Sequence, residues 1–430
     1  MGNRLHIFYP SFLYLTILLF LLGEGTVALD FLRSQISGYS HSFVITVMML
    51  ATIFLGFIKG MDKRIVSIMF SRHLILAILP VILFILACYI DVIVNLFSSN
   101  ITSSYGAFLI RHMLFVFLIL QAISCGKLFK DITMPYYHLM LFVLLTGAAL
   151  LFLSLTIDNI IDYTIDVSFL RKVNEGNLGK DLYSMPFGMG LLITGQNLAS
   201  FLGFDFYQFS SYFFEPQIFG FMMVPAFIIF LQKNYKPELR SHLIMIFIAI
   251  VLIGWAHSFT TIAALLGALL VWIFLRNIFS AIFVSSLFLI ALLMIIANFY
   301  ELSLSLSLLN KLTSYSGNNS LELFLSIGQS VSFIGDGTLN VRVGEKGENL
   351  SAFSLFFWVS FIMAVLINII NEILTNKNSA FGYALLFLWI CYFKTLWHLP
   401  QSPISIYLCL IYFSYKCSQV YFDPPMMRSR

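Results

Sequence analysis

Long apolar runs recur along the whole chain, with short polar connections between most of them. Continuous runs of this kind are typical of membrane-spanning helices, which need about 20 residues to cross the hydrocarbon layer. Twelve can be drawn, at residues 7–23, 40–58, 73–97, 107–125, 135–156, 216–232, 241–256, 259–275, 278–299, 353–371, 380–397 and 403–416. The pattern predicts an all-α polytopic integral membrane protein of about 12 transmembrane helices, with one integral domain over residues 1–430.

The distribution of Lys and Arg predicts which side of the membrane each connection occupies. With the amino terminus inside, 15 of the 24 basic residues fall on the inner side and seven on the outer side. Short cytoplasmic loops are enriched in Lys and Arg. Both termini are therefore expected to be cytoplasmic.

Two connections are much longer than the others, at residues 157–215 and 300–352, and both fall on the outer side. They hold 12 of the chain's 20 acidic residues. Most of the carboxylates available for chemistry are therefore expected outside. Within the first long loop, residues 187–204 are apolar enough to predict an interfacial or re-entrant helix.

Composition excludes several classes of function. The chain is 60% hydrophobic and only 10% charged, which excludes a soluble enzyme because lipid must be the solvent for most of it. A net charge of +4 with scattered basic residues gives no footprint for nucleic acid. The five cysteines form no CxxC pair and no Cys/His group at zinc spacing, so neither a metal site nor a disulfide framework is expected.

Glu215 lies in the clearest local signature, Tyr212-Phe213-Phe214-Glu215-Pro216, at the outer start of the sixth apolar run. A carboxylate just before a proline at a helix start is favoured by the helix dipole, which is a purely structural explanation. The alternative is catalytic: desolvation there would raise the pKa of a carboxyl enough for proton exchange with a sugar hydroxyl. Both interpretations stay open.

Aromatic residues crowd the approach to Glu215. Anchoring at the membrane interface is the favoured explanation, and stacking against sugar rings is the alternative. The residues concerned are Phe201, Phe204, Phe206, Tyr207, Phe209, Tyr212, Phe213 and Phe214.

An aromatic approach followed by Glu-Pro at the start of a span is similar to the pattern of bacterial O-antigen and exopolysaccharide polymerases of the Wzy type. Long loops after the fifth and ninth spans, with both termini inside, resemble that family's topology. The resemblance implies a glycosyltransferase, without metal or other cofactor, that joins undecaprenyl-diphosphate-linked oligosaccharide repeat units at the periplasmic face of the bacterial inner membrane. It also implies membrane lipid, a chain-length regulator and a flippase of the same pathway as partners.

Expulsion of a diphosphate requires cationic partners, for which arginine is best suited because its guanidinium binds phosphate oxygens in a bidentate way. Arg171 and Arg342, one in each long loop, are the candidates for a catalytic part beside Glu215. Lys172 is a further candidate for substrate binding. Solvated loop charge is the structural alternative for each of them.

Three more residues near the outer face are candidates for substrate binding. Arg111 lies within the fourth span at the depth of Asp91, so an interhelical ion pair is the alternative. Lys394 lies in the eleventh span, where snorkelling to the headgroups explains it equally well. His398, in the short turn that follows, can protonate or bind phosphate, although interfacial histidines often have no catalytic role.

Two other functions fit a similar architecture. An O-antigen ligase concentrates its essential groups in one large late loop, whereas the two long loops here are of similar length. A lipid-linked oligosaccharide flippase or transporter usually carries ionisable groups near the bilayer midplane and repeated halves with short loops. The polymerase interpretation is therefore preferred.

Overall fold

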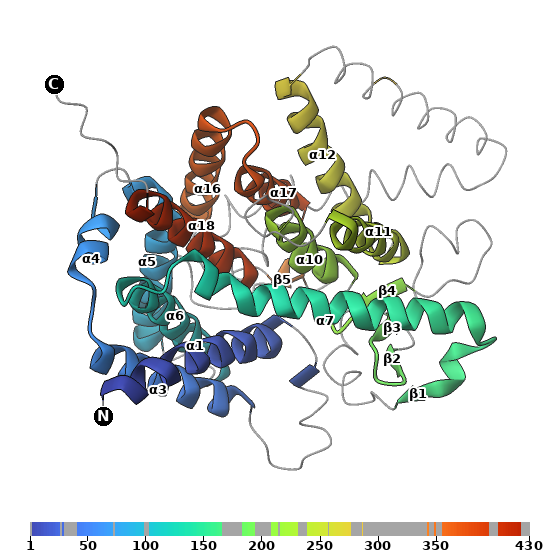
Figure 1. The fold of residues 1–430 in the computed structure, drawn as a ribbon, viewed down its shortest axis with the longest axis horizontal. Coiled ribbons are helices and arrows are strands. Elements are labelled where there is room, and N and C mark those ends of the chain that lie inside the picture. Colours follow the sequence, from blue (N-terminus) through green and yellow to red (C-terminus); the bar gives the residue numbers. More distant parts are fainter. Residues whose placement is uncertain are drawn as a thin grey trace.

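The computed structural model describes most of the chain as helix (Figure 1). The described residues are 2–25, 28–29, 41–71, 74–98, 103–165, 183–193, 208–213, 216–230, 239–256, 258–276, 286, 342–343, 348–349, 355–394 and 403–422. Within them lie 12 α-helices and several short strands.

The helices of the amino-terminal half are α1 (Gly2–Gly25), α3 (His41–Lys59), α4 (Lys63–Met69), α5 (Ile75–Ser98), α6 (Ser103–Ser124) and α7 (Phe129–Thr156). Those of the carboxyl-terminal half are α10 (Pro216–Phe230), α11 (Leu239–Ala256), α12 (Phe259–Arg276), α16 (Leu355–Thr375), α17 (Ala380–Lys394) and α18 (Pro403–Phe422). The short 3-10 helix η2 (Ile160–Tyr163) follows α7.

Eleven of the twelve predicted apolar runs are confirmed as helices. The ninth, 278–299, lies outside the described residues apart from Ser286. Helix α4 is short and was assigned to a connection. Two helices begin with proline at their first position, Pro216 and Pro403, where the missing N–H costs nothing because it has no intrahelical acceptor.

By length and composition, α3 over Ser42–Lys59 and α7 over Phe129–Thr156 are able to cross a membrane, and eight further described segments are shorter apolar helices. Only 28% of the apolar window on α3 and 33% of that on α7 is buried inside the protein. On α7, for example, Phe152 is 66% and Leu155 79% exposed. Large apolar side chains displayed along a whole helix favour contact with lipid.

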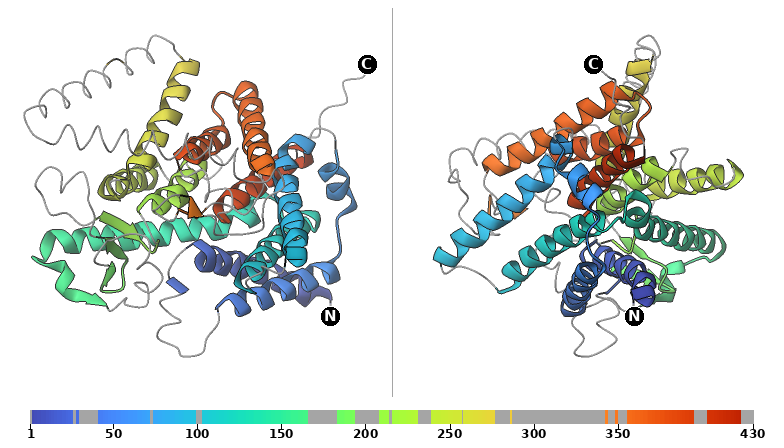
Figure 2. Two further views of the ribbon diagram at one scale, coloured as in Figure 1. Left: turned by 180° about the vertical axis from the view of Figure 1, so that it is seen from behind. Right: turned by 60° about the vertical axis from the view of Figure 1, so that its left-hand side comes forward.

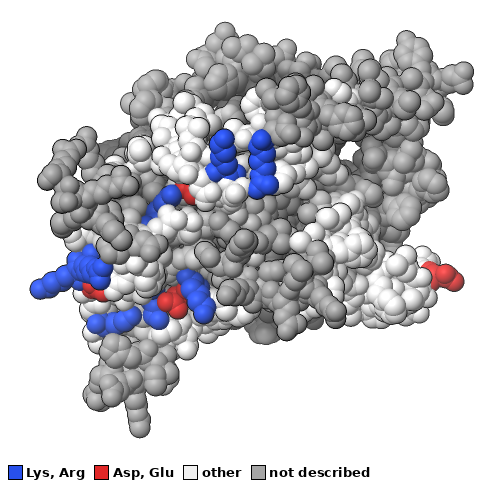
Figure 3. All heavy atoms as spheres, turned by 45° about the horizontal axis from the view of Figure 1, so that its top comes forward, with Lys and Arg blue, Asp and Glu red and all other residues white. Residues whose placement is uncertain are grey.

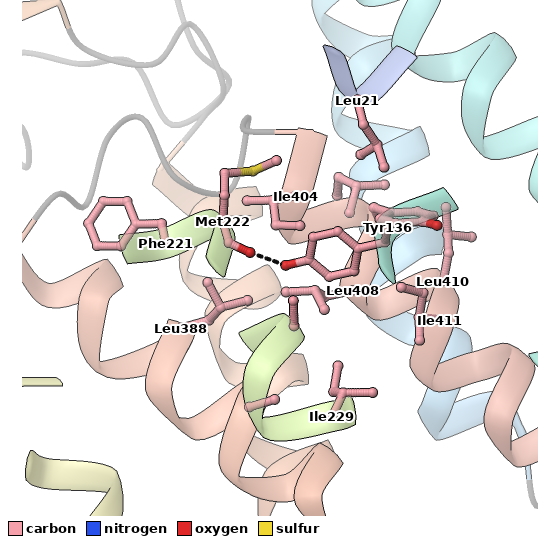
Figure 4. Close-up of a cluster of buried hydrophobic side chains, with 14 of the residues drawn as sticks. Leu21, Tyr136, Phe221, Met222, Ile229, Leu388, Ile404, Leu408, Leu410 and Ile411 are labelled. Carbon is pink, nitrogen blue, oxygen red and sulfur yellow. Dashed lines mark hydrogen bonds between the residues drawn. The ribbon is translucent and has the colours of Figure 1, made fainter. Parts of the chain in front are cut away.

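Helix α18 forms the centre of the helical packing, since every side chain from Ile404 to Tyr415 is buried. Figure 4 shows Leu408, Leu410 and Ile411 of this helix around Tyr136 of α7. The Tyr136 hydroxyl donates a hydrogen bond to the Met222 carbonyl of α10. A buried tyrosine thereby satisfies its only polar group within the apolar core.

Several connections that the sequence predicts to be cytoplasmic lie close together at the amino-terminal end of α7. Lys59 Nζ donates to the Cys125 carbonyl at 2.8 Å, and the Phe129 N–H donates to Ser418 Oγ at 3.2 Å. The Arg64 guanidinium lies over the Tyr421 ring, 4.6 Å from its centroid. The ends of α3, α6 and α18 therefore meet at this end of α7 (Figure 2).

A four-stranded antiparallel sheet lies at the opposite, carboxyl-terminal end of α7, which we call the sheet end of the molecule (Figure 1). Its strands, in spatial order, are β1 (Thr164–Ile165), β2 (Tyr183–Pro186), β3 (Leu191–Ile193) and β4 (Gln208–Ser211). Two further strands, β5 (Arg342–Val343) and β6 (Glu348–Asn349), pair with each other. The predicted all-α class therefore omits a small sheet.

The interfacial or re-entrant helix predicted at 187–204 is wrong over its described part. Residues 187–193 form a turn followed by strand β3, and the remainder lies outside the described residues. Gly188 and Gly190 both have positive φ, at 71° and 150°, which stops a helix and permits the reversal of the chain.

Candidate functional site

Strand β4 lies near the end of the first long loop, shortly before the start of α10, and it is embedded in the protein. It packs against α7, α10 and α11. All four of its residues are buried, as are Tyr212 and Phe213 after it. The sequence signature that leads to Glu215 is therefore part of the packed core at the sheet end, and not an exposed loop.

Phe209 is the apolar centre of this packing. Its ring stacks on Trp255 of α11, with centroids 5.0 Å apart, and meets Phe219 of α10 edge-to-face at 5.1 Å. Helix α7 approaches closely enough that a Cβ at Gly147 would lie 2.8 Å from Phe209 Cζ and 2.7 Å from Leu252 Cδ1. Only glycine fits at position 147 without displacing this ring.

Tyr212 links the same segment to the hairpin between β2 and β3. Its ring stacks on Phe142 with centroids 5.3 Å apart, and its hydroxyl donates to the Gly188 carbonyl at 2.9 Å. Burial raises the pKa of the Tyr212 hydroxyl, against a smaller opposing effect of a hydrogen bond with Thr146. The hydroxyl therefore stays protonated and remains a donor at neutral pH.

Replacing Tyr212 by phenylalanine is expected to lower the free energy of unfolding by about 1 kcal/mol, because the Gly188 carbonyl loses its side-chain donor. Tyr163→Phe, at an exposed ring, is the matched control and should change stability little. Thermal unfolding of the purified protein measures both. Equal effects of the two substitutions would contradict the assigned hydrogen bond.

A tight turn positions the chain just before Glu215. Ser210 Oγ donates to the Phe213 carbonyl at 2.6 Å, and the Phe213 N–H donates back to the Ser210 carbonyl at 3.1 Å. Ser211 has φ of 54° and a buried hydroxyl for which the described part of the chain offers no hydrogen-bond partner. The buried hydroxyls of Ser210 and Ser211 therefore place polar groups a few residues before Glu215, which the sequence pattern did not indicate.

Helix α10 starts immediately after Glu215 and is held close to α12. Gly220 lies against Thr261, so the two helices are in near-backbone contact. Helix α12 is itself capped by Ser258, whose Oγ accepts from the Thr261 N–H at 3.3 Å. The first turns of α10 therefore have little freedom to shift.

Four of the predicted site residues lie outside the described residues: Glu215, Arg171, Lys172 and His398. Phe213 and Pro216, which flank Glu215 in sequence, are both buried.

The other three predicted residues lie in described elements. Arg342 is in β5, paired across the strand with Asn349. Lys394 is the last residue of α17. Arg111 lies in α6, half-buried, and the side chain of its proposed partner Asp91 is outside the described part. These placements leave the catalytic role of Arg342 and the substrate-binding roles of Lys394 and Arg111 as predictions.

The aromatic approach to Glu215 differs from its predicted role. Phe209 and Phe213 are fully buried and Tyr212 nearly so, which makes these three residues core and not interfacial anchors. The remaining members of the group lie outside the described residues. Aromatic enrichment in the sequence does not distinguish an interfacial ring from a buried one, because both are apolar.

At the opposite end of α7, the structure contains a buried ion pair that the sequence did not single out. Glu372 of α16 pairs with Lys416 of α18. The carboxylate also accepts hydrogen bonds from Ser379 Oγ at 2.7 Å and from the Tyr412 hydroxyl at 3.1 Å. Glu372 comes one residue after a predicted span, where a solvated connection was the natural expectation.

Among the described residues, no group of three His, Cys, Asp or Glu side chains is arranged to hold a metal ion. A comparison with known proteins found no family model that matches the chain, and no characterised protein or solved structure with significant similarity.

Proposed function

We propose that the protein is a polysaccharide polymerase of the bacterial inner membrane. In this proposal it transfers a growing glycan from undecaprenyl diphosphate to the non-reducing end of a new lipid-linked repeat unit. The reaction would take place at the periplasmic face, at the sheet end of α7. The observation that carries the proposal is the burial of Tyr212, Phe213 and Pro216, the described residues of the signature around Glu215, in an assembly of sheet and helices at the start of α10.

The charge distribution supports this assignment of sides. Figure 3 shows basic side chains, with a few acidic ones among them, over the left and centre of the described surface, and only acidic side chains at its right-hand end, where α7 finishes. Basic residues mark the cytoplasmic side of membrane proteins. The sheet end, with Asp158 and Asp162 after α7, would then face the periplasm.

The proposed chemistry divides between an acceptor and a leaving group. Glu215 would take the proton of the acceptor hydroxyl as the new glycosidic bond forms. Arg171 and Arg342 would stabilise the diphosphate as the bond to the anomeric carbon breaks, since several negative charges develop there. Lys172, Arg111, Lys394 and His398 would bind the remainder of the lipid-linked substrate.

Gel analysis of surface glycan in a deletion strain tests the proposal. Complementation with the wild-type gene is expected to restore a ladder of long chains, and Glu215→Gln is expected to leave single-repeat glycan. Asp158→Asn, an exposed carboxylate of the same loop, is the matched control and should restore the ladder. Membrane fractions must contain equal amounts of each variant.

The same strain separates the other functions. Loss of all surface glycan, and not of chain length alone, would indicate a ligase. Transport of lipid-linked sugar across liposomes without extension would indicate a flippase. A full ladder from Glu215→Gln would remove Glu215 from the catalytic site.

A further inference from the structure

Two aromatic rings are exposed side by side at the sheet end of the molecule. Tyr163 of η2 and Phe187 of the β2–β3 turn stack with ring centroids 5.0 Å apart and planes 18° from parallel. Tyr163 is 52% and Phe187 44% exposed. The Phe187 N–H donates to the Tyr163 carbonyl at 3.1 Å, which holds the two residues in register.

Phe187 occupies a backbone conformation that phenylalanine rarely adopts. It is the first central residue of a tight turn in which the Met189 N–H donates to the Pro186 carbonyl at 3.0 Å. Its φ is 51° and that of Gly188 is 71°, the values of a type I′ turn, whose first central position favours asparagine or glycine. A half-exposed ring contributes little to the core, so burial does not explain why a strained residue stands there.

Polar groups suited to sugar hydroxyls adjoin the rings. Asp162 precedes Tyr163 and is exposed. It accepts a hydrogen bond from Asn159 Nδ2 at 2.9 Å, which orients the carboxylate and leaves further lone pairs open. A pyranose ring presents C–H groups on one face and hydroxyls around its edge. An apolar aromatic face beside carboxylate and amide groups is therefore able to contact both parts of the sugar.

The pair is joined to the candidate site through one hydrogen bond. Gly188, next to Phe187, accepts from the Tyr212 hydroxyl, and Tyr212 lies three residues before Glu215. The hairpin tip and the Tyr212–Phe213 segment that precedes Glu215 are therefore held together by a part-buried hydrogen bond.

We infer that Tyr163 and Phe187 form a stacking platform for a sugar ring of the glycan substrate, with Asp162 accepting hydrogen bonds from its hydroxyls. This inference rests on the proposed function and assigns a glycan-binding subsite to the same end of the protein. A lipid surface is the poorer occupant, because the platform comes after the last apolar turn of α7 and is flanked by carboxylates that anionic headgroups repel.

Phe187→Asn tests the platform without unfolding the protein. Asparagine suits the left-handed conformation, so the variant should be as stable as the wild type or more so. The substrate is the lipid-linked single repeat extracted from the deletion strain, and extension is followed with the protein in nanodiscs. We expect KM for the repeat to rise about three- to tenfold with kcat unchanged, the loss typical of one aromatic stacking contact.

Phe187→Trp keeps a ring and should keep KM close to the wild-type value. Phe152→Ala removes an exposed aromatic from the lipid-facing side of α7 and should leave KM and kcat unchanged. An unchanged KM in Phe187→Asn, with normal extension by the wild type, would overturn the platform and leave the proposed function standing.

A wild-type protein that extends nothing would count against the proposed function. Binding then tests the platform separately, by saturation-transfer NMR with the oligosaccharide released from the same lipid. A signal in the wild type that is lost in Phe187→Asn supports the platform. No signal in the wild type overturns it.

Discussion

Replacing Lys416 by methionine is expected to lower the free energy of unfolding by about 3 kcal/mol, the lower end of the range for breaking a buried ion pair. The Glu372 side chain is only 2% exposed and would lose its counter-charge, and the two remaining hydroxyl donors do not neutralise it. The Lys416 side chain, at 20% exposure, reaches some solvent, which favours the smaller value. Equilibrium unfolding of the detergent-solubilised protein measures the change.

Replacing Glu372, the acidic partner of the pair, is expected to lower the free energy of unfolding less than replacing Lys416 does. Glu372→Gln keeps an acceptor for Ser379 and Tyr412, and the Lys416 ammonium remains near the Tyr412 ring, 5.6 Å from its centroid. The double variant should lose about 1–3 kcal/mol less free energy of unfolding than the two single losses added together, because neither charge is left without its partner.

The pair Lys127–Asp131, at 3.5 Å just before and within the start of α7, is the matched control, since the Lys127 side chain is 18% exposed, close to Lys416, while the Asp131 side chain is 46% exposed. Lys127→Met should cost less than about 1 kcal/mol, because the carboxylate that it leaves behind, Asp131, stays in contact with solvent whereas Glu372 does not. Equal losses for Lys127→Met and Lys416→Met, or strict additivity of the Glu372 and Lys416 changes, would show that the buried pair does not stabilise α16 against α18.

The ends of α18 illustrate what the sequence predicts well and what it does not. Its start was placed at residue 403, and the helix begins there, because proline at a first helical position is a strong local signal. Its end was placed at residue 416, yet the helix continues to Phe422. Lys416 looks like the edge of a span, but its charge is compensated by Glu372, 44 residues earlier, and no local pattern reveals that contact.

At the candidate site, too, local sequence signals were predictive and features that depend on distant contacts were missed. The Glu215-Pro216 signature correctly predicted the start of a helix at Pro216. The sheet before it was missed, because strands of two to four residues carry too little alternation to detect. Its position depends on distant contacts such as Tyr212 with Gly188 and Phe209 with Trp255, which pair residues 24 and 46 positions apart.

Gly220→Ala is expected to destabilise the protein by roughly 1–3 kcal/mol, the usual cost of overpacking. A Cβ at position 220 would lie 2.7 Å from Thr261 Cβ, and the Thr261 hydroxyl and methyl groups would come closer still. Because Thr261 Cβ is fixed to the backbone of α12, rotation of the side chain does not remove the overlap, and α10 must shift. Since α10 begins directly after Glu215, the shift is also expected to reduce glycan extension per molecule of folded protein.

Gly254→Ala in α11 is the control, since a Cβ there meets no atom within 4 Å. Alanine favours a helix over glycine by up to about 1 kcal/mol, so Gly254→Ala should be neutral or stabilising, opposite in sign to Gly220→Ala. In a Thr261→Ala background the cost of Gly220→Ala should fall, because the two closest atoms are gone while the Cβ contact remains. If the cost is the same in both backgrounds, Thr261 is not the residue that keeps α10 in place, and the loss must come from elsewhere in the helix.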